Sequence, residues 1–279
     1  MTDLLIVGLI QGLILSLVAY GAMIPLRFLD FPDLTSEASY PIGASICAIL
    51  VFYDYNPYLS LLIAAFAGAL AGLITALINL RLKINSLLAG IIVTAMSYSI
   101  DLRILGKSNL SIFDRNLIFT NSSLETFILI IFILLLVTYS FYLFLKTELG
   151  LKFRAVGLNK NFAKKYNISI AKYTILGLCF GNALCGLSGA IIVQMQQYVD
   201  VGMGNGIVIH ALASLMLGET ILGNDSIKKQ IAAPLIGALL YQQIQGFAIY
   251  SGLASSDLKL LTAIIILTVI ALNKKQKLV

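Results

Sequence analysis

The residues best suited to chemistry in this chain are carboxylates that interrupt a run of apolar side chains. Residues 31–41 read FPDLTSEASYP, and long hydrocarbon stretches flank them on both sides. A charge in apolar surroundings is costly, so it usually serves a function or lies at an interface. The segment is therefore predicted to line a route through a membrane, where Asp33 or Glu37 could meet a ligand ammonium. The alternative places both carboxylates at headgroup level beside Arg27. The predicted path residues here are Asp33, Thr35, Ser36 and Glu37.

A second polar interruption occurs in the later half of the chain. Residues 194–206 read QMQQYVDVGMGNG between two apolar runs. Non-helical backbone at membrane depth is tolerated only where protein or a water-filled cavity covers it. A role in the path or its gate and simple interfacial solvation are both open for this stretch. Glu219, near the end of the following apolar run, is expected to cap its own helix. The predicted path residues of this stretch are Gln194, Gln197 and Asp200.

The familiar catalytic and metal-binding patterns are missing from the sequence. Gly106, Lys107 and Ser108 form a G-K-S tripeptide, but Asp101 stands where a phosphate-binding loop needs its first glycine. The single histidine, His210, lies alone in an apolar run and is expected to pack there. Three cysteines in apolar runs give neither a disulfide framework nor a metal site. We expect no catalytic residue, no metal and no cofactor in this chain.

Membrane-spanning helices must position these residues. Of the 279 residues, 59% are hydrophobic and 11% are charged, whereas a soluble domain carries roughly 25% charged residues. The composition predicts an all-α, polytopic membrane protein with a single transmembrane domain over residues 1–279. The first apolar run lacks a basic leader and is expected to remain as a span. Nine hydrophobic segments are predicted, at residues 4–26, 41–56, 58–80, 85–105, 125–146, 173–194, 207–223, 231–250 and 259–273. Residues 41–56 are short for a crossing and predict a discontinuous element whose helix starts at Pro41 or, for an earlier turn, near Thr35 and Ser36.

The distribution of basic residues predicts the orientation. Cytoplasmic loops carry an excess of Lys and Arg. If the N-terminus is outside, most of the 19 Lys and Arg fall in inside connections, and only Arg103, Lys107, Arg115 and Lys259 remain outside. The sequence therefore predicts an N-out, C-in topology. The net charge of +6 reflects this topology, and no motif that binds nucleic acid accompanies it.

The longest polar connection is also the most basic. Residues 147–172 read TELGLKFRAVGLNKNFAKKYNISIAK. Gly157 should break any helix that continues from the preceding span, and Asn159 is a plausible N-cap for two further turns. Phe162, Ala163 and Tyr166 would share one face of this short helix, with lysines around the other. Such a helix can lie on lipid headgroups or dock in a groove of a partner protein, and both remain open.

Here the chain resembles a family. The stretch GLKFRAVGLNKNFAKKYNI is similar to the coupling segment of bacterial ABC-importer permeases of the branched-chain amino acid and ribose type, which read G-x-x-x-R-A-x-G-x-N-x-x-x-A-x-x-x-G-I. Asn167 stands in place of the family's last glycine, a change that suits a left-handed helix end. The similarity covers nearly the whole chain and is strongest to the tryptophan/tyrosine-type subgroup. The matching residues are Gly150, Arg154, Ala155, Gly157, Asn159, Ala163 and Ile168.

The resemblance implies a transport subunit in the bacterial cytoplasmic (inner) membrane, not an enzyme. It implies a homodimer of two such chains around a central path, a cytoplasmic ATPase subunit that uses ATP and Mg²⁺, and an extracytoplasmic solute-binding protein that delivers the ligand. The cargo would be a small solute, most simply an amino acid of aromatic type. The residues that would couple to the ATPase are Gly150, Arg154, Ala155, Gly157, Asn159, Phe162, Ala163, Lys164 and Tyr166.

Two other classes compete with this interpretation. A secondary transporter driven by an ion gradient would need paired carboxylates deep in its spans, and only residues 30–37 offer any. An intramembrane enzyme would need a His/Asp/Glu constellation or a Ser–Lys pair at depth, and the sequence offers none. Uptake that survives ATP depletion but stops with an ionophore would favour the secondary transporter.

Overall fold

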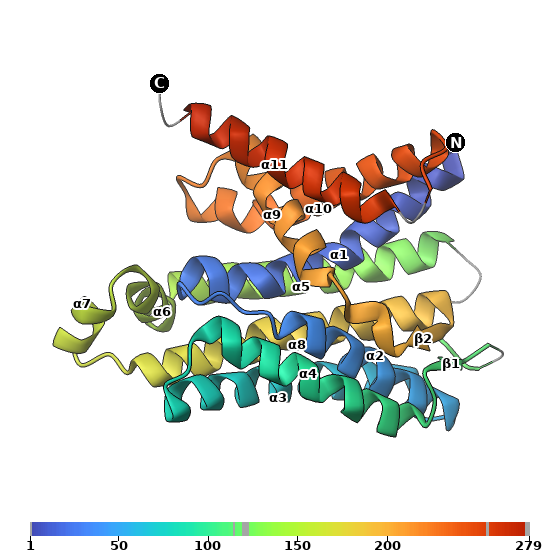
Figure 1. Ribbon diagram of the computed structural model, residues 1–279, viewed down its shortest axis with the longest axis horizontal. Coiled ribbons are helices and arrows are strands. Elements are labelled where there is room, and N and C mark those ends of the chain that lie inside the picture. Colours follow the sequence, from blue (N-terminus) through green and yellow to red (C-terminus); the bar gives the residue numbers. More distant parts are fainter. Residues whose placement is uncertain (1, 114, 119–122, 255–256, 277–279) are drawn as a thin grey trace.

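Long apolar runs form helices because a helix satisfies each backbone N–H and C=O within its own segment. The computed structural model describes residues 2–113, 115–118, 123–254 and 257–276, and Figure 1 shows their arrangement. The elements are α1 (Thr2–Phe28), α2 (Ser36–Phe52), α3 (Pro57–Leu82), α4 (Ser86–Leu105), β1 (Asn109–Ser111), α5 (Ser123–Lys146), α6 (Glu148–Leu158), α7 (Lys160–Lys165), α8 (Ile170–Gln196), β2 (Tyr198–Asp200), η1 (Val201–Gly204), α9 (Ile207–Leu222), α10 (Ile227–Tyr250) and α11 (Leu258–Gln276).

Helices dominate, but the all-α prediction needs one correction. Strands β1 and β2 form a two-stranded antiparallel sheet in which Leu110 lies opposite Val199. Strand β2 falls inside the predicted interruption at 194–206, so the backbone that leaves α8 pairs with the connection after α4. The sheet lies at the end of the molecule opposite α6 and α7 (Figure 1). Gly106 ends α4 with a positive φ of 69°, a conformation that glycine adopts without strain.

The nine predicted hydrophobic segments all lie mainly within helices, but these helices differ in length and polarity. Within the described residues, six stretches are long and apolar enough to cross a membrane, which makes the chain a multi-pass membrane protein. The helices Ser36–Phe52 and Leu258–Ala271 are apolar but shorter. The nine-segment count therefore stays a prediction. The six stretches are Leu5–Phe28, Pro57–Leu82, Ser86–Leu105, Glu125–Lys146, Ile170–Gln196 and Val201–Leu222.

Helix α8 is the centre of the packing, and it contacts α1, α2 and α3. Glycines make these contacts close. A Cβ added to Gly72 would stand 2.3 Å from the carbonyl oxygen of Leu178, and one added to Gly43 would stand 2.2 Å from that of Gly186. Small residues let helix backbones approach one another, and van der Waals packing is a main force between helices in lipid. The glycines therefore fix the distances of α2 and α3 from α8.

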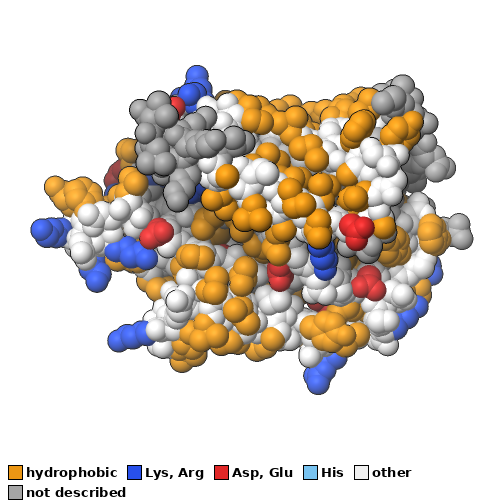
Figure 2. Space-filling model, turned by 45° about the horizontal axis from the view of Figure 1, so that its top comes forward, with side chains coloured by type: hydrophobic (Ala, Val, Ile, Leu, Met, Phe, Trp, Pro, Cys, Tyr) orange, Lys and Arg blue, Asp and Glu red, His pale blue; other side chains and the backbone are white. Residues whose placement is uncertain are grey.

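The outer surface is rich in hydrocarbon. Hydrophobic side chains spread across the face shown in Figure 2. On α3 and α5, Leu62, Phe66, Phe132 and Tyr139 are each more than 60% exposed. Apolar patches of this extent are rare on soluble monomers, and they suit contact with lipid tails or another membrane subunit.

Candidate functional site

The first polar segment joins α1 to α2 and is pinned in the interior by Asp33. One carboxylate oxygen, Oδ1, accepts a hydrogen bond from the Thr35 backbone N–H at 2.8 Å. The other, Oδ2, accepts one from Asn182 Nδ2 on α8 at 2.8 Å. Asp33 is only 7% exposed. A buried carboxylate needs such partners to offset its lost hydration, so Asp33 is bound into the protein and anchors the turn before α2.

The same network ties three helices together. Asn182 Oδ1 accepts a hydrogen bond from Ser39 Oγ on α2 at 2.8 Å, and the Thr35 and Thr75 hydroxyls lie 2.7 Å apart. Asn182, Ser39 and Thr75 were not predicted as site residues, although a polar residue in an apolar helix is a functional candidate by type. Helix α2 begins at Ser36, five residues before Pro41; Thr35 occupies the N-cap position but makes no side-chain capping hydrogen bond.

Glu37 differs from Asp33 because it faces a cavity. Its Oε1 accepts a hydrogen bond from the Gly206 backbone N–H at 3.1 Å, just before α9 begins. A Cβ added to Gly204 would stand 2.3 Å from the Glu37 carbonyl oxygen, so η1 packs directly on the first turn of α2. The two predicted interruptions therefore meet. Glu37 also lines a cavity of about 310 Å³ with His210 and Lys259.

The remaining predicted path residues of the second interruption hold local structure. Gln194 is fully buried; its Oε1 accepts from the Ile118 N–H at 3.2 Å and its Nε2 donates to the Pro57 carbonyl at 3.1 Å. Gln197 ends α8 in the left-handed conformation, with φ of 63°. Asp200 Oδ1 accepts from the Gly202 N–H at 2.7 Å and thereby caps η1. None of the three lines the cavity beside Glu37, and a path role for them stays a prediction.

A further carboxylate lies deeper than expected. Asp101 on α4 is fully buried, and both of its oxygens lack a hydrogen-bond partner in the described part of the chain. The sequence marked Asp101 only as the residue that rules out a phosphate-binding loop. The buried hydroxyl of Ser45 likewise lacks a hydrogen-bond partner among the described residues.

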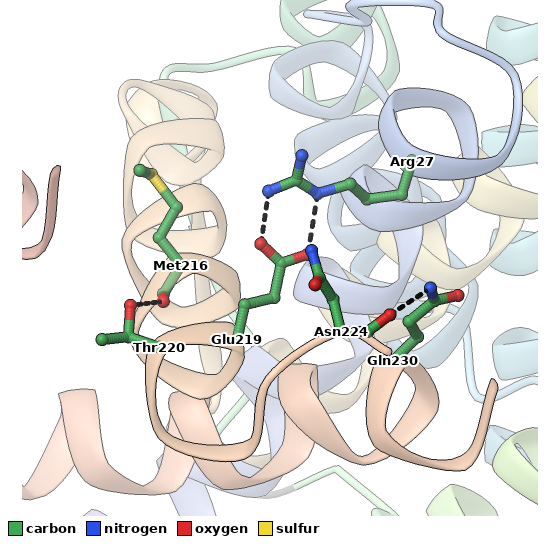
Figure 3. A network of polar contacts seen from close by, with 6 residues as sticks. All are labelled: Arg27, Met216, Glu219, Thr220, Asn224 and Gln230. Carbon is green, nitrogen blue, oxygen red and sulfur yellow. Dashed lines mark hydrogen bonds and ion pairs between the residues drawn. The ribbon is translucent and has the colours of Figure 1, made fainter. Parts of the chain in front are cut away.

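Glu219 does not cap its own helix, contrary to expectation. It forms a two-pronged ion pair with Arg27 at the end of α1, as Figure 3 shows. Arg27 Nε donates to Glu219 Oε1 at 2.7 Å, and NH2 contacts Oε2. The Glu219 side chain is 10% exposed and that of Arg27 is 45% exposed. The planar guanidinium matches a carboxylate bidentately, so this pair fastens the end of α1 to the end of α9.

Helix α6 is seated on the ends of two spans. A Cβ added to Gly150 would stand 2.2 Å from the Phe144 carbonyl oxygen, and one added to Gly157 would stand 2.1 Å from that of Phe28. The helix of the preceding span already ends at Lys146, and Gly157 lies in the last turn of α6, one residue before that helix ends at Leu158. There its missing side chain admits the end of α1. Arg154 Nε is buried and has no hydrogen-bond partner within the described residues.

Helix α7 has defined caps at both ends. Asn159 Oδ1 accepts from the N–H groups of Asn161 and Phe162 at 2.9 and 3.0 Å, which confirms the predicted N-cap. At the other end Asn167 has φ of 57°, and the Ile168 N–H donates to the Ala163 carbonyl at 2.9 Å. This is a Schellman-type ending, and it confirms that Asn167 can replace the family's glycine.

The exposed side of α6 and α7 is apolar at its centre and basic around it. Leu158 is 87% exposed, Tyr166 is 68% and Phe162 is 46%, and the two rings lie 4.4 Å apart. Ala163 is fully buried, so it anchors α7 to the body and does not share the exposed face as predicted. Lys164 stands with Lys160 and Lys165 on the exposed side.

Ala155 is half-buried in α6. On the same helix the Lys152 ammonium holds the pKa of the Glu148 carboxyl below its usual value through a hydrogen bond and its charge. The Lys152 side chain is 41% exposed and that of Glu148 is 79% exposed, so solvent screens the pair and it adds little to folding.

The chain matches the family described as the permease component of the branched-chain amino acid transport system, over residues 4–271. The chain belongs to this family. Its members are components of ABC transporters, so this protein is a transport subunit, not an enzyme, and it works with an ATPase partner. ATP-driven transport is thereby favoured over an ion-gradient mechanism.

Individual relatives agree with this assignment. The chain is 38% identical over 261 residues to a tyrosine transport system permease protein of Clostridioides difficile (strain R20291), covering 94% of this chain and 88% of the relative. It is 23% identical to the ribose import permease protein of Escherichia coli (strain K12), covering 88% and 78%. A solved ABC transporter chain in an inward-facing conformation aligns with a TM-score of 0.53 and 16% identity, over 98% of this chain and 85% of that one. The last comparison shows the ABC permease fold.

Proposed function

We propose that this chain is the permease subunit of an ATP-driven importer that carries an amino acid across the bacterial cytoplasmic (inner) membrane. The observation that carries the proposal is the surface of α6 and α7, where exposed Leu158, Phe162 and Tyr166 are ringed by lysines at one end of a multi-pass helical body. An apolar centre with a charged rim is typical of a docking surface. The similarity to a tyrosine permease makes L-tyrosine the first substrate to test.

The assembly follows from the proposed orientation. With N-out, C-in topology and nine segments, α6 and α7 meet a cytoplasmic ATPase subunit that holds ATP and Mg²⁺. A solute-binding protein delivers cargo at the end that carries β1 and β2, and a second copy of this chain completes the path as a homodimer. Figure 1 supports the topology because the N-terminus lies toward the β1–β2 end and the C-terminus toward the α6–α7 end.

A continuous series of contacts links the docking surface to the polar interior, so movement of the one can shift the other. Gly157 on α6 presses on the carbonyl of Phe28. The adjacent Arg27 is fastened to Glu219 at the end of α9. The other end of α9 starts beside Gly206, whose N–H is bound to Glu37. Tightly packed elements transmit displacement as rigid bodies, so closure of the ATPase pair would shift α1 and α9 together and change access to the cavity beside Glu37.

Introducing a negative charge at the apolar centre of the docking surface tests the proposal. We expect Leu158→Glu and Phe162→Asp to insert normally, to lose the ATPase subunit in a pull-down, and to abolish ATP-driven uptake in proteoliposomes. Lys228→Gln, a basic residue outside α6 and α7, serves as the control and should behave as wild type. Full uptake by both Leu158→Glu and Phe162→Asp would contradict this role of the surface. Ala163→Asp is a poorer probe because Ala163 is buried and the change would unseat α7.

A further inference from the structure

The cavity beside Glu37 is built from three distant parts of the chain. Its walls come from the first turn of α2, the segment that leads into α9, and the start of α11. The residues that define it are Glu37, Asn205, Ile209, His210, Lys259 and Thr262. At about 310 Å³ it lies at the lower end of the roughly 300–1,000 Å³ range of ligand pockets. It can therefore take one small molecule.

The cavity is lined by one acidic side chain, Glu37, and one basic side chain, Lys259, which is exposed. Glu37 Oε1 is held by the Gly206 N–H, and Oε2 has no hydrogen bond within the described residues. Glu37 and Lys259 line the same cavity, yet the two form no direct ion pair in the part of the chain that the structure describes. An acidic and a basic side chain thus line one space without pairing with each other.

The start of α9 strengthens the positive side of this cavity. Gly206 is the N-cap of α9, and no side chain caps the helix there. The first N–H groups of a helix carry a partial positive charge that attracts carboxylates. An anionic group bound between Lys259 and the start of α9 would therefore meet two favourable fields, while Glu37 would attract a cationic group.

A buried polar network fixes the rest of the lining. His210 Nδ1 is hydrogen-bonded to the Tyr241 hydroxyl, which also lies 2.6 Å from Thr262 Oγ1 and accepts from Gln245 Nε2 at 2.6 Å. Tyr241 is fully buried. The network ties α9, α10 and α11 together, so His210 and Thr262 are presented to the cavity in a set arrangement. His210 thus packs as predicted and lines the cavity as well.

We propose that this cavity is a zwitterion site in the transport path, where Glu37 binds the ammonium of an amino acid and Lys259 binds its carboxylate. The inference rests on the proposed function, because it names the substrate class and the residues that recognise it. Ile209, half exposed in the wall, offers an apolar contact for the side chain of the cargo.

The test is equilibrium binding of tritiated L-tyrosine to the permease purified with its ATPase subunit. Tyramine, which lacks the carboxylate, and phloretate, which lacks the ammonium, serve as competitors. We expect Glu37→Gln and Lys259→Gln each to weaken L-tyrosine binding about tenfold, as loss of one ionic contact would do. Glu37→Gln should leave phloretate competition unchanged, and Lys259→Gln should leave tyramine competition unchanged. A merely structural effect would weaken every ligand alike and would overturn the proposal.

Controls separate this inference from the proposed function. Asp225→Asn and Lys107→Gln make the same chemical changes away from the cavity and should bind as wild type. Glutamine at position 37 still accepts from Gly206, so the fold is kept. ATP-driven uptake of a panel of labelled amino acids is measured in parallel. If an amino acid other than tyrosine is taken up, binding is repeated with it and its decarboxylated and deaminated analogues. Uptake with unaltered binding in both variants overturns the zwitterion site alone, whereas no uptake of any amino acid overturns the proposed function and this site with it.

Discussion

The substitution Gly43→Ala tests whether α2 and α8 are already packed as closely as their backbones allow. A Cβ there would stand 2.2 Å from Gly186 O, 2.5 Å from Gly186 Cα and 2.6 Å from Gly186 C. All three are backbone atoms, so no change of rotamer relieves the overlap. The helices must separate by roughly 1 Å, which forfeits a quarter to a half of the dispersion energy along the contact. Since α2 carries Glu37, the change disturbs the cavity as well.

The expected cost follows from two opposing terms. Forced overpacking costs about 3 kcal/mol at the upper end of its usual range. Alanine in place of glycine stabilises a helix by about 1 kcal/mol. The predicted net loss for Gly43→Ala is therefore about 2 kcal/mol of unfolding free energy, measured by denaturant titration of the purified protein in detergent.

Gly8→Ala on α1 is the matched control. Its Cβ would meet Gln243 Nε2 at 3.0 Å, the end of a flexible side chain that can move away, so no loss of stability is expected. Equal stabilities for Gly43→Ala and Gly8→Ala would refute the close packing of α2 on α8.

Four other substitutions test the polar contacts. Asn182→Leu leaves one oxygen of buried Asp33 without its partner and should lower the free energy of unfolding by about 1–3 kcal/mol; an unchanged value would mean that water replaces the amide. Arg27→Gln should destabilise the protein more than Glu219→Gln, because only the former strands a nearly buried carboxylate; equal losses in the same titration would argue against this. Asn159→Ala removes two N–H contacts from the cap of α7 and should cost the helix about 1 kcal/mol, seen as faster amide exchange in α7 alone.

The periodic features of the fold could be predicted from the sequence because they depend on local composition. The lengths of the apolar runs predicted the positions of the helices. The N-cap at Asn159 could be predicted because a capping side chain binds backbone N–H groups within its own turn. The role of Gly157 was predicted only in part because it depends on a contact with Phe28, which is remote in sequence. A glycine that ends a helix and a glycine that lets a neighbouring backbone approach look the same in the sequence, so the sequence alone does not distinguish the two roles.

Only part of the candidate site could be predicted, because several of its contacts join residues that are remote in sequence. The polar segment at 30–37 was visible as charge amid hydrocarbon, but which carboxylate faces a cavity depends on tertiary packing. Asn182 binds Asp33, and Gly206 holds Glu37 at the cavity wall. Lys259 joined the site only through the placement of α11, since as a lone lysine near a span end it gave no signal of its own.

The central claim is that this chain works as the membrane subunit of an ATP-driven importer. The most direct measurement is to tag the chain, extract it gently from its native membrane, and identify the proteins that co-purify. The account predicts an equimolar ATPase subunit, lost in Leu158→Glu. A chain that repeatedly emerges without any ATPase in mild detergents would contradict it.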